Sequence, residues 1–267
     1  MTSRVLPCAA LALSMALPAF AQVDNDMVHA EVLPGWRDAD GTHMAALRIT
    51  LAPGWKTFWR APGDAGIPPR FRTEGSENLS TMRPIWPTPH VFNVSGMRTV
   101  GYQRELILPL EITPEADGDT VSLAGTIDMG ICSDVCVPAS LTFEATLPPD
   151  GASDARIVAA ILDTPYSASE AGVAQVDCFM GPVQYGMGLR AEITLPQMAG
   201  REEVVVEASD PYIWVAEPRS WWEGDVLIAE TELSHTERQG FTVTQDDLRI
   251  TVIADGEAVD IQGCATE

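Results

Sequence analysis

Hydrophobic and polar residues alternate most regularly between Asp119 and Pro148. This period of two is typical of β-strands that bury one face, and a break at 133–135 predicts two strands joined by a turn. The apolar positions are all odd-numbered: Val121, Leu123, Ile127, Met129 and Ile131 in the first half, and Val137, Ala139, Leu141, Phe143, Ala145 and Leu147 in the second. Cys132 and Cys136 are even-numbered, so we expect both on the face opposite the core, at the tip of the hairpin.

A three-residue turn of Ser133, Asp134 and Val135 would set the two cysteines directly opposite each other, with Cα atoms about 4.5–5.5 Å apart. A disulfide needs a Cα separation of roughly 4.4–6.8 Å, so this geometry permits one. So small a ring removes little entropy from the unfolded chain, and an exposed bridge that contributes little stability suggests a redox role. A structural staple, or a pair of free thiols, remains an equal alternative on spacing alone.

The rest of the first half also predicts short strands. The segments 27–53 and 99–112 alternate and carry turn signals such as Asp40-Gly41, whereas 82–96 contains three prolines and no period, which predicts a long irregular loop. The block 54–71 concentrates Trp55, Phe58 and Trp59 among Pro and Gly, and we expect these rings to be core anchors.

The second half predicts another set of strands after one short helix. The helix is expected at 154–162 with Asp154 or Ser153 as its N-cap. Strands are expected at 188–195, 203–208, 212–216, 226–233, 240–244 and 248–261, the last folded at Asp255-Gly256. The whole pattern is all-β and predicts two tandem β-sandwich domains, 22–149 and 171–267, joined by a short helical linker at 150–170.

The N-terminus predicts export. Arg4 precedes an apolar run from Val5 to Leu17, and Ala19-Phe20-Ala21 forms an A-x-A cleavage site, so residues 1–21 are expected to be a secretory signal peptide. Cleavage would remove Cys8 and leave four cysteines in an oxidising compartment, the periplasm. We expect Cys178 and Cys264 to form a structural disulfide across the second domain, although four cysteines allow three pairings.

Charge and missing motifs exclude several classes of function. The net charge of −22 disfavours nucleic acid and anionic lipid as partners, and no later apolar run is long enough for a membrane span. The chain has no nucleotide-binding, G-x-S-x-G or HExxH motif, so we expect no cofactor and no resident metal. One metal alternative stays open, because thiolate, imidazole and thioether groups suit Cu(I). Its candidate ligands are Cys132, Cys136, His90, Met97 and Met129, of which Met129 is expected in the core.

Four segments in order resemble a known family: GWKTFWRAPGDAGIPPRF, WPTPHVF, GYQRELILPLEI and GICSDVCVPASLTF. Over residues 28–148 they are similar to the periplasmic N-terminal domain of the thiol:disulfide interchange protein DsbD and its ScsB-type relatives. The resemblance implies an immunoglobulin-like sandwich with Cys132 and Cys136 as the active pair. It also implies a cap loop around 88–96 in which Phe92, flanked by His90 and Val91, shields the cysteines. The DsbD form has five residues between its cysteines, whereas this chain has three.

By this resemblance we expect a disulfide reductase type of enzyme that passes reducing equivalents to periplasmic disulfide-bearing proteins. The sequence carries neither the electron-carrying helices nor the thioredoxin-like domain of the family. Electrons are therefore expected from another polypeptide, either thioredoxin-like or a DsbD/CcdA-type membrane protein. Asp134 and Asp128 are expected to hold the thiols protonated until a partner docks, and Cys136 is expected to contact that partner. A copper-tolerance module that binds Cu(I), or a structural adaptor with no redox cycle, remains as an alternative.

Overall fold

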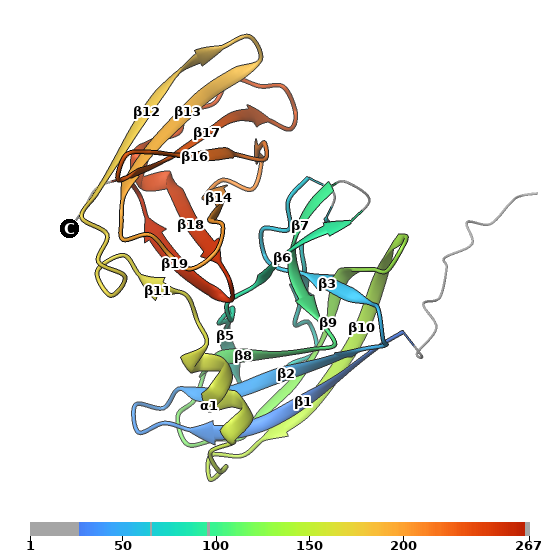
Figure 1. The fold of residues 1–267 in the computed structure, drawn as a ribbon. Helices are drawn as coiled ribbons and strands as arrows, with labels where there is room; N and C mark the ends of the chain where they lie inside the picture. The colour runs from blue at the N-terminus through green and yellow to red at the C-terminus, as the bar shows by residue number, and fades with distance from the viewer. Residues whose placement is uncertain (1–26, 65, 95–96, 265–267) are drawn as a thin grey trace, which may run out of the picture.

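The computed structural model describes residues 27–64, 66–94 and 97–264 of the 267-residue chain. The expected signal peptide at 1–21 and Cys8 lie outside these ranges. Within them, no helix combines the length and the apolar character that crossing a bilayer requires. The described part of the chain is all-β apart from one short α-helix and a 3₁₀ turn (η1, Gln245–Asp247), which confirms the expected fold class (Figure 1).

Two sheets formed by residues 28–147 pack face to face, and we call them the first sandwich. One sheet has the order β1 (Val28–Arg37), β2 (His43–Leu51), β8 (Glu105–Pro114) and β5 (Leu79–Pro84). The other has the order β10 (Cys136–Leu147), β9 (Val121–Cys132), β3 (Lys56–Phe58), β7 (Met97–Gln103) and β6 (His90–Val94), with β4 (Arg70–Arg72) paired to β9. Their inner faces bury a common core that includes Leu47, Trp59, Leu108, Ile127 and Met129.

Two further sheets form the second sandwich. One has the order β11 (Tyr166–Ser167), β19 (Glu257–Gln262), β18 (Leu248–Ala254) and β14 (Glu203–Ala208). The other has the order β12 (Gln175–Val183), β13 (Gly186–Thr194), β17 (Val226–His235) and β15 (Ile213–Val215), with β16 (Arg219–Glu223) also on β17. Asp255 and Gly256, with φ of 43° and 86°, turn β18 into β19, as the Asp-Gly pair predicts.

The helix α1 (Ala155–Leu162) begins where the sequence indicates, because the Asp154 side chain accepts a hydrogen bond from the backbone N–H of Arg156. It is amphipathic, and its buried Ile157 packs with Leu33, Met44 and Ala46 of β1 and β2. The segment expected to be a linker therefore rests on the outer face of the first sandwich. Whether the two sandwiches fold as separate domains stays a prediction.

Two local expectations are wrong, and some strands were not expected. The stretch 82–96 is not irregular throughout, because β6 pairs with β7 as a hairpin. The stretch 240–244 contains no strand. The sequence reading also missed β12, which contains Gly181 and Pro182 and lies at the end of its sheet. Pro is tolerated on such edge strands, so Gly181 and Pro182 are compatible with a strand here.

Candidate functional site

The hairpin that carries the two cysteines forms with the expected register. Cys132 pairs with Cys136, and every residue from Val121 to Ile131 has its partner in β10. Ser133, Asp134 and Val135 form the turn, with the Ser133 N–H donating to the Val135 carbonyl at 3.3 Å. The cysteines are joined by a disulfide with a Cα–Cα distance of 4.1 Å, slightly shorter than the range expected for opposed residues. A disulfide therefore closes the outer end of the hairpin.

The two cysteines differ in burial, which corrects the expectation that both are exposed. Cys136 is exposed, whereas Cys132 is only 2% exposed. The reason is their place in the sheet: β10 is its last strand, whereas β9 lies between β10 and β3. The outer face of β9 is also covered near the tip, because a Cβ on Gly130 would come within 2.6 Å of the Phe58 ring and 2.9 Å of the Ile67 Cβ. A glycine inside a strand often marks such a close approach, and this signal was available in the sequence.

Lys56 lies beside the disulfide and was not singled out from the sequence. It is the one lysine of the chain, and it is the register partner of Cys132 across β3 and β9. Its ammonium lies 4.9 Å from the centre of the Phe92 ring, within the range of a cation–π interaction. The only signal in the sequence was a lone cation within the aromatic block GWKTF.

Phe92 lies on the face of the sheet that carries the cysteines. The register runs from Lys56 to Gln103 across β3 and β7, and from Thr99 to Phe92 across β7 and β6, so these side chains share one face. Phe92 is half-buried, and its ring contacts that of the exposed His90 edge-on at 6.2 Å. The segment expected to be a cap loop is a β-hairpin, so backbone pairing holds it. Val91 belongs to the opposite face, where it packs against the core, so the structure does not place it as a shield.

The two acidic residues expected to influence the thiols are placed differently from each other. Asp128 forms an ion pair with Arg72 at 2.7 Å and lies opposite Ser140, four positions along β9 from Cys132. Arg72 thus balances its charge, and its influence on the thiols stays a prediction. Asp134 is exposed in the turn between the cysteines, and its influence stays a prediction.

Comparison with known families decides how this geometry is understood. Residues 29–148 match the family described as "Thiol:disulfide interchange protein DsbD, N-terminal". This segment belongs to the DsbD N-terminal family. Its members share an immunoglobulin-like sandwich, which agrees with the two facing sheets of the first sandwich. The DsbD-type segment is thus a thiol–disulfide interchange module in general terms.

The fold of the whole chain, including the second sandwich outside the DsbD-type segment, has a counterpart among solved structures. It is similar to "Crystal structure of the N-terminal periplasmic domain of ScsB from Proteus mirabilis", with a TM-score of 0.67 and 22% sequence identity. The similarity covers 93% of this chain and 97% of that chain. At this identity it shows the fold alone. Among curated proteins, no sequence matches significantly.

The DsbD-type site does not bring the candidate copper ligands together. Met129 is 2% exposed on the core face of β9, opposite to the face that carries the cysteines, and Met97 is exposed on β7. Within residues 27–64, 66–94 and 97–264 no group of three or more His, Cys, Asp or Glu side chains is arranged to hold a metal ion. The geometry therefore gives the copper alternative no support.

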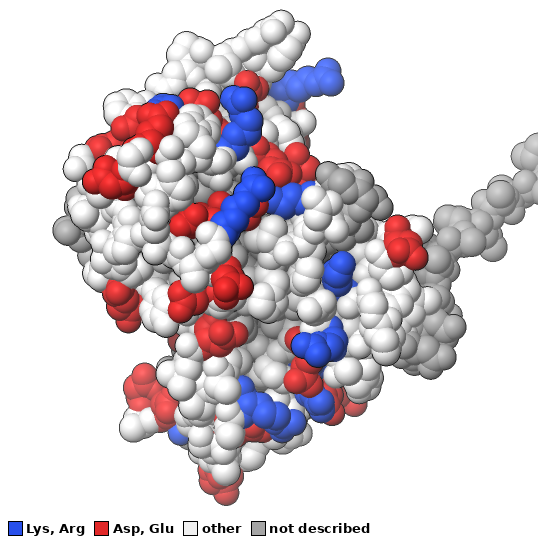
Figure 2. Space-filling view, viewed as in Figure 1, with Lys and Arg blue, Asp and Glu red and all other residues white. Residues whose placement is uncertain are grey.

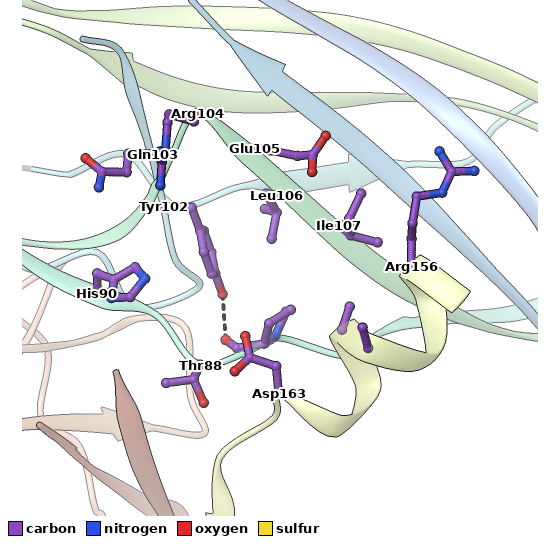
Figure 3. A pocket seen from close by; sticks show the side chains of 13 residues that line it. Thr88, His90, Tyr102, Gln103, Arg104, Glu105, Leu106, Ile107, Arg156 and Asp163 are labelled. Atoms are coloured by element: carbon purple, nitrogen blue, oxygen red, sulfur yellow. Dashed lines mark hydrogen bonds between the residues drawn. The ribbon is translucent and has the colours of Figure 1, made fainter. Parts of the chain in front are cut away.

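A pocket of about 800 Å³ lies between α1 and the strands β7 and β8 (Figure 3). His90 and Asp163 border it. Burial raises the pKa of the Asp163 carboxyl, and nearby His90 partly opposes that shift. Burial also raises the pKa of Tyr102 well above its ordinary value, so its hydroxyl stays protonated and donates to the Pro87 carbonyl at 2.8 Å. This bond anchors the chain segment that leads into β6.

The second disulfide has a different setting from that of the DsbD-type pair. Cys178 and Cys264 are joined with a Cα–Cα distance of 5.6 Å, and both are buried in the core of the second sandwich. Cys178 lies on the edge strand β12, and Cys264 follows β19 on the other sheet. The bridge therefore links the two sheets.

Proposed function

We propose that this protein exchanges thiols and disulfides with other proteins in the periplasm through Cys132 and Cys136. One observation carries the proposal: a DsbD-type domain presents, at the tip of a hairpin, a disulfide with one exposed and one buried sulfur-bearing residue. The signal-like N-terminus and the periplasmic origin of the ScsB domain support the compartment.

The unequal burial suggests the order of attack. In the oxidised protein, a partner thiolate attacks the sulfur of Cys136, forming a mixed disulfide and releasing Cys132 as a thiolate. The second thiol of the partner then displaces Cys136, which leaves a dithiol here and a disulfide on the partner. In the reverse direction Cys136 attacks the partner's disulfide and Cys132 resolves the mixed disulfide. Each cycle moves two electrons and needs no further oxidant or reductant.

The surroundings of the tip suit a protein partner. Val135, next to Cys136, is 68% exposed and offers an apolar contact to a docked protein. The Lys56 ammonium, beside Cys132, would favour the thiolate that leaves in the first step. We propose a thioredoxin-like or DsbD/CcdA-type membrane protein as the electron donor and periplasmic disulfide-bearing proteins as acceptors.

Single-cysteine variants test this order. The partner is a thioredoxin-like protein whose second active-site cysteine is replaced by Ala and whose remaining cysteine carries a small-thiol disulfide. With it, Cys132→Ala should displace the small thiol and accumulate a mixed disulfide through Cys136, because no resolving thiol remains on either protein. Cys136→Ala should form none, because Cys132 is buried. Trapping in both variants to the same extent would contradict the order of attack, and undiminished exchange in the double variant would contradict the proposed function.

A further inference from the structure

One face of the second sandwich is built to meet the first. On the sheet of β14, β18 and β19, one face packs into the second sandwich's own core, and the other alternates apolar and charged side chains. Val205, Ile253 and Ala258 of that outer face are 6%, 2% and 1% exposed and belong to the core of the first sandwich. This sheet is thus buried on both sides, which explains the continuous apolar run of EVVVEA.

Arg98 of β7 enters this contact from the first sandwich. Its guanidinium lies 3.2 Å from Glu203 Oε2, 3.1 Å from the Val204 carbonyl oxygen and 3.0 Å from Glu217 Oε1, all in the second sandwich. The Arg98 side chain is only 10% exposed. A charge so far removed from water is stable only when it is paired, so these contacts tie β7 to the second sandwich.

Arg60 makes a second tie two residues after β3. It donates two hydrogen bonds to the Glu207 carboxylate, at 3.1 and 2.9 Å, and its guanidinium stacks 3.8 Å above the Trp59 ring. Burial lowers the pKa of Arg60, and Glu207 opposes that shift. Figure 2 shows that basic side chains lie next to acidic ones on the visible face of both sandwiches, although the chain has more acidic than basic residues.

The face of β7 on which Arg98 lies shows which part of the first sandwich these contacts support. Arg98 shares the inner face of β7 with Val100, whereas Thr99 and its partner Phe92 are on the outer face. The β6–β7 hairpin therefore has the second sandwich behind it and Phe92 in front. β6 is the last strand of its sheet (Figure 1), so its position depends on β7. A groove beside Val91 is lined by Glu203, Ile253 and Gly256 of the second sandwich.

We infer that the second sandwich braces the β6–β7 hairpin from behind, and that Arg98 is the positioning residue that holds Phe92 beside the cysteine tip. The second sandwich then controls how readily the cap moves aside. This inference rests on the proposed function, in which Phe92 limits access to the reduced cysteines.

The test is the rate at which the reduced Cys132/Cys136 pair reacts with iodoacetamide, in the full chain with the Cys178–Cys264 disulfide intact. Arg98→Gln should raise this rate roughly five- to tenfold, the factor expected when partly buried ion pairs are lost. Arg98→Lys should restore most of the protection. Arg190→Gln is the matched control, since Arg190 pairs with Glu192, Glu223 and Glu230 within the second sandwich, and its rate should equal that of the unmodified protein.

A double variant shows whether Arg98 acts through Phe92. Phe92→Ala should be at least as fast as Arg98→Gln, and combining the two should add nothing further. If Arg98→Gln multiplies the rate in the Phe92→Ala background, the inference is overturned, because Arg98 then acts elsewhere.

Amide hydrogen exchange tests whether the second sandwich braces the β6–β7 hairpin, independently of whether Phe92 shields the cysteines. Arg98→Gln should accelerate exchange in β6 and β7 while exchange in β9 and β10 stays unchanged, and unchanged exchange in the β6–β7 hairpin would overturn the brace. If Phe92→Ala leaves the alkylation rate unchanged while Arg98→Gln still accelerates exchange of the hairpin, the brace stands. The shielding assumed in the proposed function then fails.

Discussion

The two disulfides of this protein differ in their position in the fold and in the sequence separation of their cysteines. Cys132–Cys136 spans a sequence separation of four at the open end of one hairpin, whereas Cys178–Cys264 spans 86 and joins two sheets through a buried core. A bridge constrains the unfolded chain more when it closes a longer loop. The first is therefore suited to opening and closing without loss of the fold, and the second to holding the fold together. Position and sequence separation thus suit the same chemical bond to two different uses.

Removing each bridge in turn gives the largest expected difference. The variant Cys178→Ala/Cys264→Ala should lose about 4 kcal/mol of unfolding free energy on the chain-entropy model, and Cys132→Ala/Cys136→Ala about 2 kcal/mol or less. Urea denaturation measures both. Equal losses would mean that the hairpin bridge is also a structural staple, and would revive the adaptor alternative.

Mild reduction should separate the bridges by rate. Dithiothreitol should open Cys132–Cys136 roughly a hundredfold faster than Cys178–Cys264, since attack on a buried bridge requires local opening of the second sandwich. Peptide mass mapping after alkylation counts which cysteines are free at each time. Simultaneous opening of both bridges would contradict the contrast.

The hairpin that carries Cys132 and Cys136 could be predicted from the sequence, whereas the unequal burial of these two cysteines could not. The odd-numbered apolar residues around Cys132 and Cys136 predict the hairpin, its register and its turn because a local period determines all three. Cys132 lies on β9, which is flanked by β10 and β3, and Phe58 and Ile67 cover the same face at Gly130. Phe58 and Ile67 are far away in sequence, and no period links them to β9. The pairing of Lys56 with Cys132 has the same origin. The run EVVVEA predicted a strand but not the partner of its second face, because that partner is the other sandwich.

Gly130 offers a way to reduce the asymmetry between the two cysteines. Gly130→Ala places a Cβ against the Phe58 ring and Ile67, so the cover over β9 must shift, which should cost about 1–3 kcal/mol of stability. The shift should also expose Cys132, so Cys136→Ala/Gly130→Ala should form a mixed disulfide that Cys136→Ala alone does not. The matched control is Gly181→Ala on β12, where an added Cβ meets no atom within 4 Å. A Cys132 that remains unreactive would show that the neighbouring strands, and not Phe58 and Ile67, bury it.

Lys56 should give the smallest effect, because its charge is partly exposed to water and an interaction of that kind contributes under about 1 kcal/mol. In Lys56→Met the ammonium that favours a thiolate at Cys132 is lost, and the cation–π contact with Phe92 is lost with it. The two losses act in opposite directions on alkylation: less thiolate slows it, and a looser cap speeds it. In the Phe92→Ala background only the first remains, so Lys56→Met should there slow alkylation at pH 7 by about threefold, whereas Lys56→Arg should keep the rate. An unchanged rate for Lys56→Met in that background would show that Lys56 serves the cap alone, and the difference between the two disulfides would then owe nothing to charge.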